Sequence, residues 1–316
     1  MFAAAIFLQS PAPAMPGASS SKGENIDFDR DTTQRMTVPV TINGGGPYNF
    51  IVDTGAERTV ISEELAQRLR LSEGRSARVH SITEVQSVGT VIIPDLTVSR
   101  NTVRAINAPA LARRDLGADG MLGVDSLKSQ RVLFDFERDT MWVSPSSSRP
   151  EVRMENDTII VRARSKFGHL ILADAHVDGQ KVFVIIDTGS QVSIGNEALR
   201  RKLAKHRKLR WLDRVEVVSV TGGKLTADYA QVNELRVGGV ELRNMPIAFA
   251  DAYPFRKLDL ISRPALLLGM DSLAMFDRVS IDFANRSVKF DMPDFSARRP
   301  DTRLASLEPA SRSAAR

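Results

Sequence analysis

The chain has 316 residues, of which 42% are hydrophobic and 26% are charged, and its formal net charge is +5. This length is enough for two domains with separate cores, and the composition is typical of a globular protein. Because the chain has no cysteine and only 4 histidines, a disulfide scaffold, a thiolate zinc site and a cysteine nucleophile are excluded, which leaves carboxylates and hydroxyls as candidate chemical groups.

The first residues resemble the end of a secretory signal peptide. Phe2–Leu8 is an apolar run, and Ala12-Pro13-Ala14 has the small-x-small form of a cleavage site, although no positive residues precede the run. No apolar run approaches the ~20 residues that span a bilayer. We therefore expect an exported protein, periplasmic or secreted, with no integral membrane segment in the mature chain.

After residue 36 the chain has the pattern of a mainly β unit built around one Asp-Thr-Gly sequence. Alternating and apolar stretches predict its strands, and Ser62 is a credible N-cap for its clearest helix. In chain order we expect a strand over Thr37–Ile42, a turn at Gly44–Gly46, an apolar strand ending at Phe50-Ile51-Val52, the turn Asp53-Thr54-Gly55-Ala56, an apolar stretch at Val60–Ile61, a helix over Ser62–Leu69, the sequence Gly120–Leu127 that contains Leu122-Gly123, and strands over Val132–Phe136 and Thr140–Val143.

The same order of elements returns in the second half of the chain. It consists of a strand over His169–Val177, a turn at Asp178-Gly179, an apolar strand ending at Val184-Ile185-Ile186, the turn Asp187-Thr188-Gly189-Ser190, an apolar stretch at Val192–Ile194, a helix over Asn196–Leu203, the sequence Leu266–Leu273 that contains Leu268-Gly269, and strands over Val279–Phe283 and Ser287–Phe290. The period is far too long for a solenoid, so it predicts a duplicated domain. We expect Asp125 and Asp271, which follow Leu-Gly in the two copies, to be structural N-caps.

The repeat divides the chain into five predicted segments, with a Ser-, Pro- and charge-rich stretch as the linker. They are a signal-like, disordered N-terminus (1–24), a first repeat (25–145), a linker (146–157), a second repeat (158–293) and a disordered basic tail (294–316).

The duplicated Asp-Thr-Gly sequence is the feature that indicates chemistry. Each Asp follows an apolar strand that gives its carboxyl group a rigid base, and the adjacent Gly allows a backbone geometry that a side chain would block. The Thr hydroxyl can donate to main-chain carbonyls. If the copies pack about a pseudo-twofold axis, Asp53 and Asp187 face each other and share one proton. Such a pair can activate water directly, so we expect no metal and no cofactor.

These residues resemble the retropepsin-like aspartic proteases of bacterial type, in a single-chain form. The resemblance covers roughly Arg35 to Pro293 and rests on three blocks that each occur twice: hydrophobic-hydrophobic-Asp-Thr-Gly-Ala/Ser, hydrophobic-Leu-Gly-x-Asp, and the strand hairpin that contains Asp-Phe. It implies an all-β, bilobal acid-protease fold of pepsin or retropepsin type, a duplicated barrel with a few short helices. It also implies an aspartic endopeptidase for a peptide or protein substrate, acting as a monomer that is an internal pseudo-dimer.

The resemblance also assigns roles to individual residues. The catalytic pair is Asp53 and Asp187. The residues that support it are Thr54, Gly55, Ala56, Thr188, Gly189 and Ser190 in the turns, and Leu122, Gly123, Leu268 and Gly269 beneath them in a psi-shaped strand arrangement. Candidate substrate contacts are Glu57 and Gln191 after the turns, and Thr221, Gly222 and Gly223 at the tip of a predicted flap over Val218–Ala227. The corresponding stretch of the first copy, Val79–Val91, lacks a Gly pair, which argues against two equal flaps.

The two turns differ at one position, Ala56 in the first and Ser190 in the second. A Ser190 hydroxyl bonded to Asp187 would favour the charged form of that carboxyl, and Asp53 would then carry the shared proton. Arg58 could instead stabilise a charge on Asp53. The sequence does not rank these two effects.

Two other readings of the repeat compete with a protease. A non-catalytic peptide-binding module on the same fold is the main alternative, although two buried facing carboxyls are costly without a catalytic use. A two-carboxylate glycosidase would need a wider separation than matched turns suggest. The basic residues over Leu199–Arg210 could form a patch for anionic membrane or nucleic acid, but no aromatic residues interleave them, so we read a solvated helix face and expect no nucleic-acid partner.

Overall fold

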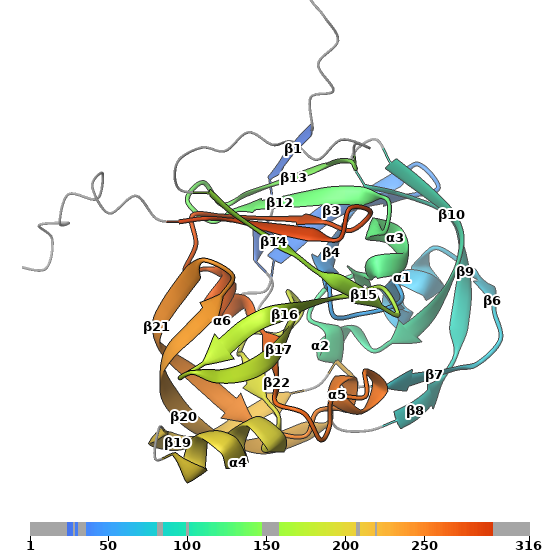
Figure 1. Ribbon diagram of the computed structural model, residues 1–316. Coiled ribbons are helices and arrows are strands. Elements are labelled where there is room, and N and C mark those ends of the chain that lie inside the picture. Colours follow the sequence, from blue (N-terminus) through green and yellow to red (C-terminus); the bar gives the residue numbers. More distant parts are fainter. Residues whose placement is uncertain are drawn as a thin grey trace, which may run out of the picture.

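The computed structural model describes residues 24–27, 29–30, 36–80, 85–98, 101–146, 158–206, 209–218 and 220–292. The predicted signal-like segment, nearly all of the linker and the basic tail lie outside these residues, so the predictions made for them remain predictions. Within the described residues the protein is mainly β with six short helices, as the sequence predicts (Figure 1).

The first repeat forms one eight-stranded sheet, a separate hairpin and three helices. The sheet has the order β2 (Asp29–Arg30), β3 (Met36–Ile42), β4 (Gly45–Val52), β11 (Gly120–Leu122), β5 (Val60–Ser62), β10 (Asn101–Leu111), β9 (Thr90–Val98) and β6 (Ser72–Glu73). The hairpin is β7 (Ala77–His80) with β8 (Val85–Val88), and the helices are α1 (Glu63–Arg68), α2 (Arg113–Leu116) and α3 (Val124–Leu127).

The second repeat forms a sheet of the same size with three helices of its own. Its order is β15 (Arg164–Lys166), β16 (His169–Val177), β17 (Gln180–Ile186), β22 (Ala265–Leu268), β18 (Ile194–Gly195), β21 (Val240–Phe249), β20 (Lys224–Val237) and β19 (Arg210–Val218). The helices are α4 (Glu197–Lys205), α5 (Tyr253–Lys257) and α6 (Met270–Leu273).

The two strand orders correspond position by position, which confirms the predicted duplication. In the first repeat β3 also pairs with β9, and in the second β16 also pairs with β20, so each sheet closes on itself as a barrel. The fold is therefore a duplicated acid-protease barrel. The predicted N-caps of the longer helices are also confirmed, because Ser62 accepts a hydrogen bond from the Leu65 N–H and Asn196 from the Leu199 N–H.

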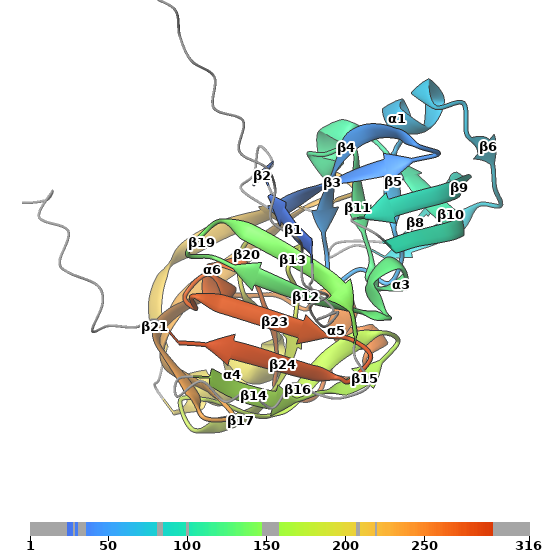
Figure 2. The ribbon, with the colours of Figure 1, turned by 90° about the horizontal axis from the view of Figure 1, so that it is seen from above.

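A third, six-stranded sheet joins the repeats. Figure 2 looks onto this sheet, in which β12 of the first repeat pairs with β23 of the second. Its order is β1 (Glu24–Asp27), β13 (Thr140–Pro145), β12 (Gln130–Asp135), β23 (Arg278–Asp282), β24 (Ser287–Asp291) and β14 (Thr158–Arg162). In β12 and β24 buried residues alternate with half-buried ones, as in a sheet with one covered face, and the buried side faces the barrels.

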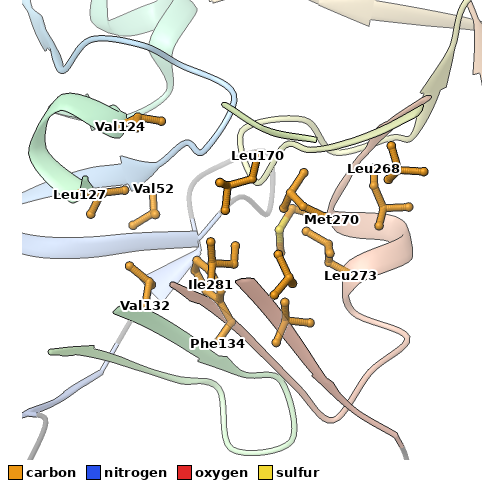
Figure 3. Packing of buried hydrophobic residues seen from close by; sticks show 14 of the residues in the cluster. Val52, Val124, Leu127, Val132, Phe134, Leu170, Leu268, Met270, Leu273 and Ile281 are labelled. Atoms are coloured by element: carbon orange, nitrogen blue, oxygen red, sulfur yellow. The ribbon is translucent and has the colours of Figure 1, made fainter. Parts of the chain in front are cut away.

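The largest hydrophobic cluster crosses the boundary between the repeats. In Figure 3, Val52, Leu127 and Phe134 of the first repeat lie opposite Leu170, Met270 and Ile281 of the second. All six side chains are buried. The two repeats therefore share one core, and this shared core sets the position of one Asp-Thr-Gly turn against the other.

Three sequence predictions about local elements need correction. The strand β4 begins at Gly45, so only the start of the predicted glycine turn is a turn. Helix α4 ends at Lys205, and Arg210 belongs to strand β19, so the basic stretch is a helix followed by an edge strand. The N-caps of α3 and α6 are Gly123 and Gly269 rather than Asp125 and Asp271.

Candidate active site

The structure places the two Asp-Thr-Gly turns at the ends of equivalent buried strands. Strand β4 pairs in parallel with β11, and β17 pairs in parallel with β22. Each Asp-Thr-Gly turn therefore follows a strand that lies inside its sheet rather than at an edge. The Asp53 N–H donates to the Leu122 carbonyl and the Asp187 N–H to the Leu268 carbonyl, both at 3.0 Å. Both Asp side chains are buried.

The two threonines connect the turns by four reciprocal hydrogen bonds. The Thr54 hydroxyl donates to the Ile186 carbonyl at 2.9 Å and accepts from the Thr188 N–H at 3.2 Å. The Thr188 hydroxyl donates to the Val52 carbonyl at 2.7 Å and accepts from the Thr54 N–H at 3.1 Å. Each hydroxyl is buried and bonded on both sides, so the two turns are held at a fixed separation.

The glycines of the turns face the opposite carboxyl groups. A Cβ atom added to Gly55 would lie 2.6 Å from Oδ1 of Asp187, and one added to Gly189 would overlap the Asp53 carboxyl group. A side-chain hydrogen bond joins the two carboxyls. The geometry thus brings Asp53 and Asp187 into direct contact, and only glycine leaves room for this approach.

The two carboxyl groups accept main-chain hydrogen bonds from equivalent positions of their turns. Oδ1 of Asp53 accepts the N–H groups of Gly55 at 2.7 Å and Ala56 at 3.0 Å. Oδ1 of Asp187 accepts the Gly189 N–H at 3.1 Å, and the Ser190 N–H also acts to lower the pKa of Asp187. Burial, followed by the nearby Asp53 carboxylate, raises the pKa of Asp187 to about 8. The raised pKa favours the protonated form of the Asp187 carboxyl.

The Ser190 hydroxyl does not make the hydrogen bond to Asp187 on which the sequence-based hypothesis depends. A hydroxyl has one hydrogen, and that of Ser190 donates to the Val192 carbonyl at 2.8 Å rather than to Asp187. The Arg58 side chain is exposed, and its backbone, not its guanidinium group, packs against Gly123. Main-chain N–H groups, which the sequence does not reveal, donate to both carboxyls.

Two hydroxyl residues beneath the turns were missed by the sequence reasoning. The Gly123 N–H donates to the Thr59 hydroxyl at 3.2 Å, and the Gly269 N–H donates to the Ser193 hydroxyl at 3.0 Å. Thr59 in turn donates to Asp125. Ser193 donates in the same way to Asp271 at 2.7 Å. The sequence did contain a sign of these residues, because each copy has a hydroxyl side chain at the same spacing after its Asp-Thr-Gly. A hydroxyl side chain alone, however, does not indicate which group it bonds.

The Leu-Gly blocks lie directly under the turns. Leu122 and Leu268 are buried, and a Cβ on Gly269 would lie 2.6 Å from the Val192 carbonyl oxygen. After each Gly, the first N–H of the short helix donates to a turn carbonyl, Val124 to Ala56 and Met270 to Ser190. These bonds connect the psi-shaped strands to the turns in both copies.

The residues after the turns, Glu57 and Gln191, have different surroundings. Oε1 of Glu57 lies 2.6 Å from Nζ of Lys257 in α5 and 3.6 Å from Nε2 of His169, both in the second repeat. Burial lowers the pKa of His169, although Glu57 and Asp53 act in the opposite direction. Gln191 is exposed. Glu57 is therefore part of an ionic contact between the repeats, a role that the resemblance did not suggest.

Each repeat has a hairpin at the position of the predicted flap, and each reaches the opposite repeat. In the second, β19 and β20 flank Thr221, Gly222 and Gly223, and Gly222 has a left-handed φ of +81° and lies against Asp115 of α2. In the first, β7 and β8 form the hairpin, with residues 81–84 outside the described part. There His80 stacks on Tyr253 of α5, with ring centroids 4.1 Å apart.

Comparison with models of protein families identifies the family of this chain. The family model described as aspartyl protease matches residues 38–126 and 173–272, so it matches once in each repeat and covers both Asp-Thr-Gly turns. No curated protein matches the chain. Among the helices in the described ranges, none has both the length and the apolar character needed to cross a membrane.

Proposed function

The chain belongs to the retropepsin-like aspartyl protease family, and on this premise we propose that it hydrolyses peptide bonds with a water molecule held between Asp53 and Asp187. The observation that carries the proposal is the reciprocal set of Thr54 and Thr188 hydrogen bonds, which holds the two carboxyls in contact. A module that only binds peptides gains nothing from this costly pair.

In the proposed reaction the two carboxyls have different tasks. The Asp53 carboxylate accepts a proton from water, whose oxygen attacks the scissile carbonyl carbon, while Asp187 donates its proton to the carbonyl oxygen. The resulting diol collapses as Asp53 passes its proton to the leaving nitrogen and Asp187 regains a proton from the diol hydroxyl. The raised pKa of Asp187 supports this division.

An extended polypeptide is the proposed substrate. The flap hairpin of β19 and β20 supports this, because its backbone can add the substrate as a further strand while alternate side chains enter pockets. Thr221, Gly222 and Gly223 are the proposed flap contacts. We also propose that both halves of the site come from one chain, as an internal pseudo-dimer, and that the N-terminal apolar run directs export.

Single substitutions of the two carboxyls test the proposal. Asp53→Asn and Asp187→Asn should each lower cleavage of denatured casein by about a thousandfold, because neither carboxyl alone supplies both proton transfers. Asp174→Asn, which changes an exposed carboxyl of β16, is the matched control and should remain active. Peptide fragments are read by mass spectrometry, and circular dichroism confirms that the variants fold.

Two outcomes would contradict the paired mechanism. Full activity in either single variant would show that the carboxyls do not act together. A wild-type protein that binds peptides but leaves them intact for days would favour the peptide-binding module.

A further inference from the structure

A cationic surface with an exposed tryptophan lies on the second repeat, outside the proposed active site. We define the α4–β19 patch as Arg201, Lys202, Lys205, Trp211, Leu212 and Arg214. Helix α4 buries Ala198, Leu199 and Leu203 against the barrel, which leaves its basic side chains exposed to solvent. Strand β19 follows as the edge of the sheet, with β20 as its neighbour.

Contacts show that the helix and the strand form one surface. Asp228 of β20 lies 3.8 Å from Arg200 of α4 and 3.5 Å from Arg214 of β19. Trp211 and Arg214 oppose Ala230 and Asp228, which are alternate residues of β20, so both side chains point to the face that Arg200 touches.

The apolar part of the patch is unusually exposed. Trp211 has 51% and Leu212 46% of its surface exposed, and a bulge in the pairing with β20 lies between Trp211 and Asp213. The Trp211 ring makes an edge contact with Phe249, with centroids 6.4 Å apart, so the ring is supported from below while its outer part faces solvent. Two neighbouring large apolar side chains at a sheet edge mark an interaction surface.

Most of the charges around these side chains are positive. Arg201 is 69% exposed and lies 3.9 Å from Glu197, and Asp213 is an exposed carboxyl between Leu212 and Arg214. Within the described ranges, no ion pair neutralises Lys202 or Lys205. The equivalent helix of the first repeat, α1, has Glu63 and Glu64 in its first turn and only Arg68 as a basic residue in its last turn, whereas α4 has Glu197 in its first turn and two lysines in its last. The cationic character is thus a property of the second repeat and not of the duplicated fold.

We propose that the α4–β19 patch binds membrane surfaces that contain anionic phospholipid. Tryptophan and leucine insert at the headgroup boundary, and surrounding Lys and Arg bind lipid phosphate, which is the composition of interfacial membrane sites. A nucleic-acid platform would need several rings on which bases stack, whereas this patch holds one ring beside an aliphatic side chain.

Vesicle binding by the full chain tests the proposal. Trp142→Phe leaves Trp211 as the single tryptophan, since the chain has 2. Its emission should shift to shorter wavelength with vesicles of phosphatidylcholine and phosphatidylglycerol, but not with phosphatidylcholine alone. In the wild-type background, Arg201→Gln/Lys202→Gln/Lys205→Gln should weaken partitioning into the anionic vesicles by roughly a hundredfold, at about fivefold per cation. Trp211→Ser/Leu212→Ser should also weaken it.

A matched control removes the same charge from the first repeat. Arg104→Gln/Arg114→Gln/Lys128→Gln changes three exposed basic residues and should leave partitioning within about threefold of wild type. Thermal unfolding by circular dichroism verifies that each variant is folded. The proposal is overturned if the patch variants bind like the control, if neutral vesicles bind equally well, or if the protein binds duplex DNA and no vesicles.

Discussion

The turn at Asp53 and the turn at Asp187 are built from the same main-chain and threonine hydrogen bonds, yet the residues that follow them have different surroundings. The turn N–H groups donate to Asp53 at 2.7 and 3.0 Å and to Asp187 at 3.1 Å. After the turn, Glu57 forms an ion pair with the other repeat where Gln191 is exposed. Duplication therefore preserved the contact geometry and its main-chain donors, while the residue that follows each turn came to differ.

The largest effect on the paired turns is expected when a methyl group fills the space between a turn glycine and the opposite carboxyl. Gly189→Ala and Gly55→Ala should each lower proteolytic activity by at least about a hundredfold, because the added methyl group displaces the opposite carboxyl. Gly89→Ala is the control, since a Cβ there meets nothing within 4 Å. Cleavage rates at saturating peptide measure the effect. An active Gly189→Ala variant would contradict the close contact.

The threonines test whether the two turns are equal in energy. Thr54→Ala and Thr188→Ala should each lower the free energy of unfolding by about 1–3 kcal/mol, because each leaves a buried carbonyl and a buried N–H without a partner. Thr54→Ser retains the hydroxyl and should lose less. Urea unfolding provides the values. If the losses in free energy of unfolding caused by Thr54→Ala and Thr188→Ala differ by more than the width of this range, the two turns do not contribute equally to stability.

The pH dependence of stability tests the raised pKa of Asp187. Asp187 has its pKa raised from 3.8 to about 8, so the folded protein holds a proton that the unfolded chain releases between these values. This contribution to stability is complete below about pH 4 and is lost as the pH rises to about 8. Over this range the free energy of unfolding falls by at most about 1.4 kcal/mol per pH unit.

Unfolding free energies measured across this range should therefore fall less steeply in Asp187→Asn than in the wild type. The activity of the wild type should also decline as the pH approaches 8, because Asp187 loses the proton that it donates. An unchanged slope in the variant would place the shared proton elsewhere.

The smallest expected effect concerns the ionic contact found in only one of the turns. Glu57→Gln makes the first turn resemble the second and should lower stability by about 1 kcal/mol or less, because the Glu57 side chain is partly exposed. A double-mutant cycle with Lys257→Met should return a coupling energy of similar size that decreases with added salt. A coupling of zero would mean that the ion pair does not contribute to joining the repeats.

Much of the site could be predicted because its residues are close in sequence and occur twice. Asp53, Thr54 and Gly55 form one turn whose local requirements are visible in the residue types, and the copy at Asp187 confirms the pattern of elements. The roles of Thr59 and Ser193 could not be predicted, because a hydroxyl bonds whichever groups the fold brings near. The hydrogen bond predicted from the Ser190 hydroxyl to Asp187 was wrong for the same reason, since that hydroxyl bonds a main-chain carbonyl.

The sequence by itself determined the duplication, the β character and the residues that meet at the centre, because periodic apolar patterns and glycine turns act locally. Only the tertiary structure decided how the halves join: β12 pairs with β23, Glu57 reaches Lys257, and Trp211 remains at an edge beside α4. These contacts link residues distant in the chain, and their free energy depends on burial and distance, which no local pattern encodes.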